Sequence, residues 1–405
     1  MQEKNTETKQ FQDMTIEVTD NPYHLNLEDI MEVGKRVNNN KRNFLFISKL
    51  LGKHIEVKPD ICKCTGRLLT SLKYPMKTES LIQYISNQNI DISKELNKAI
   101  PINQKTLVIG FAETATGLGM SVAASIKNAT YVTTTREEIP NIKKVFTFEE
   151  EHSHATTHKM YFDDFYKFDQ IILVDDEITT GNSMLNLIKA LVKFTNIKNF
   201  TILSILDWRN NDQKSEFHRI KRKLKIDIAT YALISGQIHS ETNETFLIDK
   251  ETELKETTSA TYNFTELERK YGYWKDSGKF GVEQSSIEIL EKVCEKIAEK
   301  IDCILAVNGY KESDKILILG HGENIYIPSR VAAHLSFDTY FKTTTRSPIY
   351  TDGKTIKTTD YFYDKGVKYY FYNKEEIEKK YQKVIMIAEG NCNIKLCNNM
   401  MLVRI

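Results

Sequence analysis

The sequence lacks a long apolar segment and lacks an excess of charge of either sign. No apolar run approaches the roughly 20 residues that a membrane-spanning helix needs, and the N-terminal stretch MQEKNTETKQFQDM has no apolar core of the kind found in signal peptides. Lysine and arginine number 56 and aspartate and glutamate 55, so the formal net charge is +1 at pH 7. We therefore expect a cytoplasmic protein that spans no membrane and whose main partner is not nucleic acid.

Cysteine is scarce, and its spacing is irregular. The cysteines are Cys62, Cys64, Cys294, Cys303, Cys392 and Cys397. No two of them have the C-x-x-C spacing of a zinc ribbon, which argues against such a site. Reduced thiols with a structural role are the simplest interpretation.

The length of 405 residues exceeds what one hydrophobic core usually holds, which predicts two domains. Between residues 31 and 240, apolar strand-like runs alternate with helix-like segments, a pattern typical of an α/β fold with a parallel sheet. The clearest strand candidates are 106–111, 129–134, 171–174 and 200–206, and the clearest helix candidate is 183–194. Ligands bind such sheets at the carboxyl ends of the strands, so the loops that follow these runs are the candidate site.

A polar segment separates this region from the rest of the chain. Residues 1–30 are expected to form a loosely packed leader, and residues 241–282, rich in Thr and Glu, a linker or a peripheral excursion. A second α/β region is predicted over residues 283–405. Its helix candidate is 286–301, and its strand candidates are 315–320, 338–345 and 383–389.

The second α/β region repeats features of the first at a constant separation. Gly110 and Glu113 have counterparts in Gly320 and Glu323, and the run TTTR at 133–136 recurs at 343–346, all 210 residues apart. VAAS at 122–125 resembles VAAH at 331–334, one residue out of step, and QIILVDDE at 170–177 aligns loosely with QKVIMIAE at 382–389. The shared offset favours a duplicated domain whose second copy has lost the paired aspartates.

The stretch 171-IILVDDEITTGNSM-184 carries the strongest chemical signal. Two adjacent carboxylates repel each other and resist burial, so Asp175 and Asp176 need a cation or a hydroxyl-rich ligand. The hydroxyls, Gly181 and the helix N-terminus that follow suit a phosphate monoester. The carboxylates can accept hydrogen bonds from a ribose diol or hold Mg²⁺. The simpler alternative is a solvated loop in which Thr179 or Thr180 caps the next helix.

This stretch resembles the phosphoribosyl pyrophosphate (PRPP) signature of the type I phosphoribosyltransferases. The resemblance implies that Asp175 and Asp176 hold the ribose hydroxyls with Mg²⁺ nearby and that the following loop wraps the 5′-phosphate. The PRPP-binding residues that it implies are Asp175, Asp176, Glu177, Ile178, Thr179, Thr180, Gly181, Asn182 and Ser183. Two positions depart from the family pattern. Glu177 replaces an apolar residue, and Thr179 replaces the aspartate of purine-salvage members with the hydroxyl of orotate-type members.

Further features occur where the resemblance requires them. The stretch 110-GFAETATGLG-119 resembles the family's pyrophosphate loop, which implies that Ala112, Glu113, Thr114 and Ala115 bind pyrophosphate. Arg136 follows the next strand, and an arginine fork matches phosphate oxygens. Residues 147–160 fit a mobile lid that excludes water from the reaction. Within the lid, the three candidate residues are His152, His154 and His158, read either as contacts to the substrate, as exposed histidines or as metal ligands.

Recognition of the base is assigned to the end of the next strand, 204-SILDWR-209. Trp208 can stack on a ring, and Asp207 or Arg209 can hydrogen-bond its edge; the alternative is a core tryptophan beside a surface ion pair. Upstream, the stretch 41–55 has helical periodicity and basic residues. It is predicted to supply cations to the site or to form a basic helix face.

The second region resembles a known accessory domain. The runs 345-TRSP-348 and 320-GHGENIYIPSR-330 are similar to the TRSP domain that follows a bacterial phosphoribosyltransferase group associated with tellurite-resistance and stress gene clusters. That group is thought to make nucleoside-like metabolites. The candidate phosphate-binding residues of this region are Gly320, His321, Gly322, Glu323, Asn324 and Arg346. The alternatives are that the domain receives the base, holds a phosphorylated product or acts as a scaffold.

The predicted function is an Mg²⁺-dependent transfer of ribose 5-phosphate from PRPP to a nitrogenous base, with release of pyrophosphate. Arg136, Asp175 and Asp176 are the catalytic candidates, and Asp175 and Asp176 also the metal candidates. The alternatives are a PRPP- or nucleotide-binding regulator and the reverse reaction on a nucleotide. The base, the direction and the oligomeric state, with a homodimer among the options, are left open.

Overall fold

The computed structural model describes residues 7–11, 14–37, 42–149, 157–240, 246–247, 251–254, 260–266, 270, 277–389 and 395–405. The chain forms two compact units, each assembled from three separate segments. Unit 1 consists of Met1–Asn26, Lys63–Glu241 and Asp276–Ile287, and unit 2 of Leu27–Cys62, Thr242–Lys275 and Glu288–Ile405. The division of the sequence into domains at residues 240 and 283 stays a prediction, since the two units interleave along the chain.

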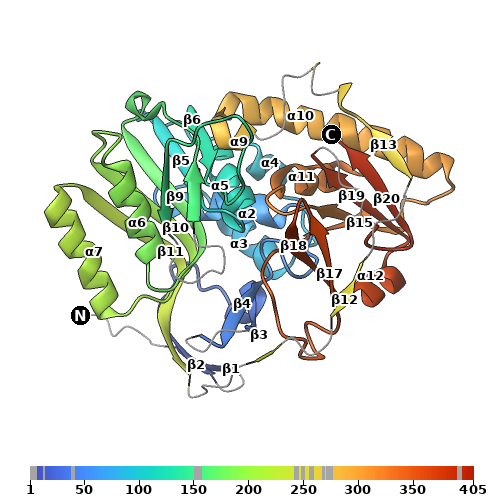
Figure 1. Ribbon diagram of the computed structural model, residues 1–405, viewed down its shortest axis with the longest axis horizontal. Helices are drawn as coiled ribbons and strands as arrows, with labels where there is room; N and C mark the ends of the chain where they lie inside the picture. Colours follow the sequence, from blue (N-terminus) through green and yellow to red (C-terminus); the bar gives the residue numbers. More distant parts are fainter. Residues whose placement is uncertain are drawn as a thin grey trace. The chain divides into compact units, whose positions relative to one another are not determined.

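An eight-stranded sheet forms the centre of unit 1, in the order β1-β2-β11-β10-β9-β5-β6-β14. Figure 1 labels the parallel strands of this sheet, β5, β6, β9, β10 and β11. Its strands are β1 (Glu7–Phe11), β2 (Met14–Asp20), β5 (Thr106–Gly110), β6 (Ala129–Thr133), β9 (Gln170–Ile178), β10 (Asn199–Asp207), β11 (Asp227–Ser240) and β14 (Val282–Glu283). The five strands from β11 to β6 run parallel. This confirms the predicted α/β class. The run 171–174 is fully buried, as expected for a parallel strand covered on both faces.

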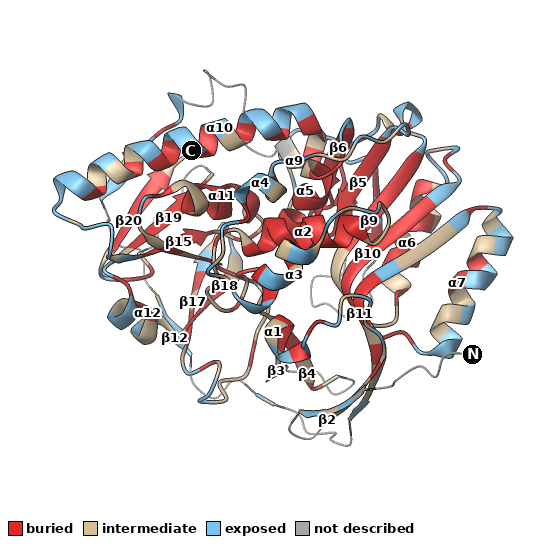
Figure 2. Cartoon of the chain, turned by 180° about the vertical axis from the view of Figure 1, so that it is seen from behind, coloured by how far each residue is buried: buried red, intermediate tan, exposed pale blue. Residues whose placement is uncertain are grey.

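Helices and one hairpin complete unit 1. They are α2 (Ile61–Ser71, whose first two residues belong to unit 2), α3 (Glu79–Ser86), α4 (Ser93–Leu96), α5 (Ala115–Ala124), η1 (Phe165–Lys167), α6 (Asn182–Leu191), α7 (Asn211–Leu224), α9 (Ser277–Phe280) and the antiparallel pair β7 (Phe146–Glu149) and β8 (Thr157–Met160). Helix α5 is buried along almost its whole length, whereas α7 has one exposed side (Figure 2). Asn210 and Gln213 form a capping box that fixes the start of α7.

Two N-terminal segments differ from the sequence-based expectation. The expected leader contains β2, which pairs with the edge of β11 because Met14, Ile16 and Val18 alternate toward the core. The stretch 41–55, expected as a helix, contains β4 (Phe44–Ser48) instead. This strand pairs with β3 (Met31–Lys35) in unit 2, and its aromatic and branched residues favour a strand over a helix.

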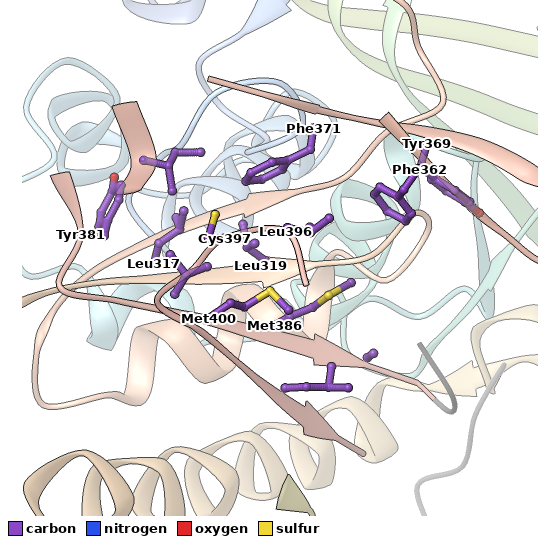
Figure 3. Close-up of a cluster of buried hydrophobic side chains, with 14 residues drawn as sticks. Leu317, Leu319, Phe362, Tyr369, Phe371, Tyr381, Met386, Leu396, Cys397 and Met400 are labelled. Atoms are coloured by element: carbon purple, nitrogen blue, oxygen red, sulfur yellow. The ribbon is translucent and has the colours of Figure 1, made fainter. Parts of the chain in front are cut away.

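A parallel sheet of the order β13-β20-β19-β15-β16 forms the centre of unit 2. Its strands are β13 (Thr261–Asn263), β15 (Lys315–Gly320), β16 (Asp338–Thr343), β19 (Lys383–Ala388) and β20 (Met400–Arg404); a second sheet joins β12 (Thr252–Glu253), β17 (Thr359–Asp364) and β18 (Val367–Tyr372). The helices are α1 (Leu27–Ile30), α10 (Gln284–Val307, whose first turn belongs to unit 1), α11 (Tyr326–His334) and α12 (Lys374–Lys380). Figure 3 shows the core, in which Leu319, Phe371 and Met386 gather with other buried side chains.

The two units repeat one arrangement of strands. Unit 1 contains the strand order β10-β9-β5-β6 and, in a separate sheet, the hairpin β7–β8. Unit 2 contains the strand order β20-β19-β15-β16 and, in a separate sheet, the hairpin β17–β18. One difference concerns the strand that bears the acid pair. β9 is followed by the long helix α6, whereas the described residues 395–399, which precede β20, contain no helix. This repetition supports the duplication inferred from the constant offset. Within the described part of the chain, no helix is both long enough and apolar enough to cross a membrane.

Candidate active site

The acid pair lies where β9 leaves the core. Residues 170–174 of this strand are buried, whereas Asp175, Asp176 and Glu177 are half-buried. The strand continues beyond the pair, since Asp175 is paired with Ser204 of β10. The backbone N–H of Asp176 donates to Oδ1 of Asp175 at 3.0 Å, which orients that carboxylate. The pair is therefore held on a rigid strand and open to a ligand.

The loop after β9 turns at a glycine directly into the N-terminus of α6. Gly181 has φ of +81° and is the N-cap of α6, a left-handed conformation that glycine adopts without strain. A Cβ at this position would lie 2.6 Å from the ring of Phe217, so only glycine fits. The backbone N–H of Asn182 donates to Oγ1 of Thr180 at 3.3 Å. The hydroxyls of this loop thus lie next to the N-terminus of a ten-residue helix, whose dipole favours an anion.

The predicted pyrophosphate loop connects β5 to α5 beside the acid pair. β5 pairs with β9 so that Gly110 faces Val174, and the N–H of Phe111 donates to the Val174 carbonyl at 3.1 Å. The two predicted loops therefore begin side by side. The peptide bond between Ala112 and Glu113 is cis, and the N–H of Ala112 donates to Oγ1 of Thr134 at 3.0 Å. Glu113 is buried, with an exposed fraction of 3%.

Arg136 follows β6 and is flanked by a lysine that sequence reasoning missed. Lys159 of β8 donates from Nζ to the carbonyl of Arg136 at 2.8 Å and lies 3.6 Å from Glu138. Thr135 and Lys159 also exchange backbone hydrogen bonds, so the hairpin β7–β8 is attached to the chain directly before the arginine. Lys159 lies within the predicted lid segment 147–160, and its contact with Arg136 could not be predicted. Nothing in the local sequence shows which strand this segment contacts. The lysine adds positive charge beside Arg136.

His158 is a buried histidine, and the structure does not support the exposed alternative for it. Its exposed fraction is 0%, its Nδ1 lies 3.0 Å from Oγ1 of Thr134, and its ring stacks on Phe148. Through Thr134 it contacts the same hydroxyl that holds the N–H of Ala112. His152 and His154 lie outside the described residues. In the part of the chain that the structure describes, no group of three or more His, Cys, Asp or Glu side chains is placed to hold a metal.

Asp175 and Asp176 suit an Mg²⁺ ion that is also bound by the phosphates of a substrate. Protein sites for this ion commonly use one or two carboxylates, and substrate phosphates and water complete its coordination. Asp175 and Asp176 provide two half-buried carboxylates of this kind next to an anion-binding loop. These two residues would hold the ion.

The predicted base-contacting residues divide into two roles. Trp208 is buried at 6% exposure, and its backbone N–H donates to the Ile178 carbonyl at 2.8 Å. Arg209 donates from Nε and Nη2 to the two carboxylate oxygens of Asp207, at 2.9 and 2.7 Å. Both side chains of this ion pair are buried, so it is not the surface pair considered from sequence. The guanidinium also lies 4.2 Å from the ring centre of Phe217, the ring that contacts Gly181.

A cavity of about 450 Å³ opens beside this ion pair. It is lined by Thr19, Asp20, Asp207, Arg209, Lys214, Phe217, His218, Lys221, Ile228, Thr230 and Ser235. Nη1 of Arg209 is not used by Asp207 and makes no hydrogen bond among the residues that the structure describes. With Lys214 and Lys221 on the facing helix, the cavity carries more positive than negative groups. It suits a ligand with oxygen acceptors.

The candidate residues of unit 2 also come together. The loop Gly320–Asn324 follows β15, and Gly322 approaches the ring of Tyr369 so closely that a Cβ would lie 3.1 Å away. The hydroxyl of Tyr369 accepts hydrogen bonds from Nε and Nη2 of Arg346, at 3.2 and 2.8 Å. The ring of His321 lies 4.4 Å from the same tyrosine.

A parallel sheet that carries an acid pair and a glycine-bearing turn before a helix N-terminus, both at its carboxyl edge, suits a ligand with hydroxyl and phosphate groups. The family model described as phosphoribosyl transferase matches residues 30–237, and the model described as the TRSP domain C-terminal to that family matches residues 276–403. The chain therefore belongs to this phosphoribosyl transferase family and carries the TRSP domain. It is a phosphoribosyltransferase, an enzyme of the glycosyltransferase class.

Solved structures add distant likenesses. Adenine phosphoribosyltransferase from Trypanosoma brucei, in complex with AMP, pyrophosphate and ribose 5-phosphate, is 13% identical, with a TM-score of 0.34 over 54% of this chain and 82% of that one. The enzyme from Rhodothermus marinus is also 13% identical, with a TM-score of 0.31 over 52% and 96%. That from Giardia lamblia, with 9-deazaadenine, is 16% identical, with a TM-score of 0.26 over 44% and 80%. These scores are too low to carry an argument, and no curated protein matches the sequence.

Proposed function

We propose that unit 1 transfers ribose 5-phosphate from PRPP to a nitrogenous base and releases pyrophosphate, with Mg²⁺ bound to the substrate. The observation that carries the proposal is the pairing of β5 with β9, which starts the pyrophosphate loop and the acid pair at one edge of the sheet. A diphosphate and a ribose are joined through one carbon, so their binding groups must lie this close together. A nucleoside-like product in a stress-response pathway is part of the proposal, and it rests on the resemblance of the runs 345–348 and 320–330 to the TRSP domain.

The protein groups have separate roles in this reaction. Asp175 and Asp176 accept hydrogen bonds from the ribose hydroxyls, and the turn Thr179–Ser183 holds the 5′-phosphate. When bound, Mg²⁺ withdraws charge from the departing pyrophosphate. Arg136 and the neighbouring Lys159 act on the same charge, and positioned cations of this kind commonly supply a large part of such catalysis. The attacking atom belongs to the base, so no nucleophilic side chain is required.

Water exclusion is the proposed role of the hairpin β7–β8. A ribosyl cation-like transition state reacts readily with water, so the site must close before the bond breaks. Thr135 and Lys159 attach the hairpin next to Arg136, so closure and pyrophosphate contact are linked through one strand. His158 supports this attachment through Thr134 and needs no contact with substrate.

The proposed site of the acceptor base is the cavity beside Arg209, and its side chains favour an acceptor that carries oxygen atoms. Asp207 is fully engaged by Arg209, so the groups left to meet a ligand are Nη1 of Arg209 and the side chain of Lys214. Trp208 packs against Gly236 and its backbone is held by Ile178, so its proposed role is to support this end of the strand. An acceptor with a carbonyl or carboxylate substituent fits these donors better than one with an amino group.

The test is calorimetric titration of PRPP with Mg²⁺ into the wild type and into the Asp175→Asn/Asp176→Asn variant. We expect the variant to lose at least about tenfold in affinity, or ~1.4 kcal/mol. The control is Asp163→Asn, which removes an exposed carboxylate of the same unit and should bind like the wild type. Wild-type protein that ignores PRPP and binds a nucleoside monophosphate would favour the regulator or the reverse reaction. Binding of neither ligand would exclude the proposal.

A further inference from the structure

The loop of unit 2 reproduces the hydrogen-bond framework of the pyrophosphate loop in unit 1. The N–H of Ala112 donates to Oγ1 of Thr134 at 3.0 Å, and that of Gly322 donates to Oγ1 of Thr344 at 3.1 Å. The N–H of Thr134 donates to the Gly110 carbonyl, and that of Thr344 to the Gly320 carbonyl. Each pair of equivalent residues is 210 positions apart. The framework that shapes an oxyanion loop in unit 1 is thus intact in unit 2.

The correspondence continues along the strand that carries the arginine. Thr135 exchanges backbone hydrogen bonds with Lys159 of the hairpin β7–β8, and Thr345 does the same with Tyr370 of the hairpin β17–β18. In each unit, the next residue along the chain is an arginine, Arg136 or Arg346. The hairpin, the loop and the arginine therefore have the same connections in both units.

In unit 2 the histidine that contacts the threonine hydroxyl is His321 of the loop itself, whereas in unit 1 it is His158 of the hairpin. The ring nitrogens of His321 lie 2.8 Å from Oγ1 of Thr344 and 3.2 Å from Oδ2 of Asp364. Both nitrogens are occupied, so His321 is a positioning residue and has no nitrogen left for a ligand. It ties the loop to the hairpin residue Asp364, in addition to the contact through Tyr369.

The groups around this loop that suit a ligand are hydrogen-bond donors. Arg346 is half-buried and fixed by Tyr369 beside Gly322. Nδ2 of Asn324 is buried and makes no hydrogen bond among the described residues. The nine-residue helix α11 begins directly after this loop, with its positive end toward it. An arginine, an amide donor and a helix N-terminus together match the oxygens of a phosphate group.

Charge determines which form of phosphate fits. One arginine is accompanied by two carboxylates, Glu323 of the loop and Asp364 of the hairpin. A bare anion of several charges would be repelled by them, whereas a magnesium complex carries less negative charge and offers bound water to a carboxylate.

We propose that unit 2 contains a second oxyanion site, formed by the loop Gly320–Asn324 and Arg346, which binds a magnesium-complexed phosphate or pyrophosphate group. The site has no counterpart of Asp175 and Asp176, so it binds the group without a ribosyl transfer. It goes beyond the proposed activity of unit 1 and does not depend on it.

The test is calorimetric titration of magnesium pyrophosphate into the full-length chain. We expect two equivalents to bind to the wild type, one to Arg346→Gln, one to Arg136→Gln and none to the double variant. Arg346→Lys, which keeps the charge and loses the fork, should retain the second site with at least tenfold weaker affinity. Lys354→Gln, an exposed lysine of the same unit, is the matched control and should bind like the wild type. Thermal unfolding of each variant verifies that it is folded.

The possible results separate the two sites. A single wild-type equivalent that is lost in Arg136→Gln and kept in Arg346→Gln would overturn the inference. A single equivalent lost only in Arg346→Gln would support it and contradict the pyrophosphate role of unit 1. Equal loss in Arg346→Gln and Lys354→Gln would indicate nonspecific attraction and overturn it. Omission of Mg²⁺ should weaken the second site, and stronger binding without the ion would contradict the charge argument.

Discussion

Three buried side chains support the predicted phosphate loop Thr179–Ser183 where it turns at Gly181. Phe217 contacts Gly181 and the guanidinium of Arg209, and Asp207 fixes that guanidinium in two hydrogen bonds. A buried arginine keeps its charge under all conditions of interest, so its partner cannot be removed without leaving that charge uncompensated.

The first prediction concerns this ion pair. Asp207→Ala should lower the free energy of unfolding by about 3–5 kcal/mol, because the buried Arg209 loses its counterion. Glu216→Ala, which breaks the exposed pair with Arg219 on the same helix, should have little effect. Urea denaturation of both variants measures the difference. Equal effects would show that burial of the Asp207 pair carries no extra stability.

The second prediction concerns Gly181. Gly181→Ala places a methyl group 2.6 Å from Phe217 and requires a left-handed alanine, so it should weaken PRPP binding and lower the free energy of unfolding by roughly 2–4 kcal/mol. Gly353 has φ of +71°, and a Cβ added there would meet no atom within 4 Å, so Gly353→Ala incurs the backbone strain alone. That control should cost about 1 kcal/mol. Similar losses in the two variants would rule out the contact with Phe217 as the cause.

The third prediction concerns Lys342, which is 1% exposed and donates to the Tyr372 carbonyl. Burial lowers the pKa of Lys342 to about 8, although Glu56, Cys397 and Asp360 act in the opposite direction. Between pH 8 and about 10.5 the unfolded chain binds more protons at this lysine, so its contribution makes the protein more stable as pH rises, by about 3 kcal/mol in total.

The measurement compares wild type with Lys342→Met. Urea denaturation at pH 7.5 and pH 10 should show a smaller gain, or a larger loss, of stability with pH in the variant than in the wild type. The difference between the two proteins isolates Lys342 from tyrosines that titrate in the same range. Identical pH dependence would mean that the lysine is not desolvated in the folded protein.

At the scale of elements, the sequence predicted the strands whose apolar residues are continuous. The run 171–174 reads as a strand because it is buried on both faces, and it lies in β9. β4 was misread because Phe44, Leu45, Phe46 and Ile47 form a short apolar run that fits either period, and only pairing with β3 decides it. The sequence also could not predict the bidentate contact between Asp207 and Arg209. Two charged residues at this spacing can form a buried ion pair or can each be exposed to solvent without contact.

The fourth prediction concerns helix α7. Lys214 and Lys223 are on the same helix, but only Lys214 lines the cavity beside Arg209. Lys214→Gln should raise the KM for an acceptor that carries a carboxylate by about 3–10-fold and leave PRPP affinity unchanged, because one exposed charge contact is worth about 1 kcal/mol. Lys223→Gln is the matched control. Steady-state kinetics with acceptors that have or lack the carboxylate gives the answer, and a uniform effect on both would contradict a contact with that group.

At the scale of the whole molecule, the two units cannot be separated by one cut. The hairpin β3–β4 belongs to unit 2, where Ile47 packs in a buried cluster with Ile349, Ile356, Tyr370 and Tyr372. Unit 1 in turn includes β1 and β2 at one edge of its sheet and β14 at the other. Each sequence-contiguous half therefore lacks pieces of its own core.

The fifth prediction follows for a fragment that spans residues 31–240. This fragment loses β2 from the edge of β11 and the cluster that covers Ile47, so it should unfold at lower urea concentration than the full chain and be digested faster by protease. A fragment that also contains residues 1–30 should regain part of the stability, because β2 is restored. Full stability of the shorter fragment would show that these segments are dispensable.

The interleaving also has a consequence during synthesis. Val57 exchanges backbone hydrogen bonds with Phe341, and both belong to unit 2. A ribosome adds about 5–20 residues per second. The segment around Val57 is therefore synthesised on the order of tens of seconds before its partner strand β16. During that interval the apolar side chains and unpaired backbone of this segment can associate with other nascent chains. Correct folding then requires that this segment be protected from aggregation until β16 has been synthesised.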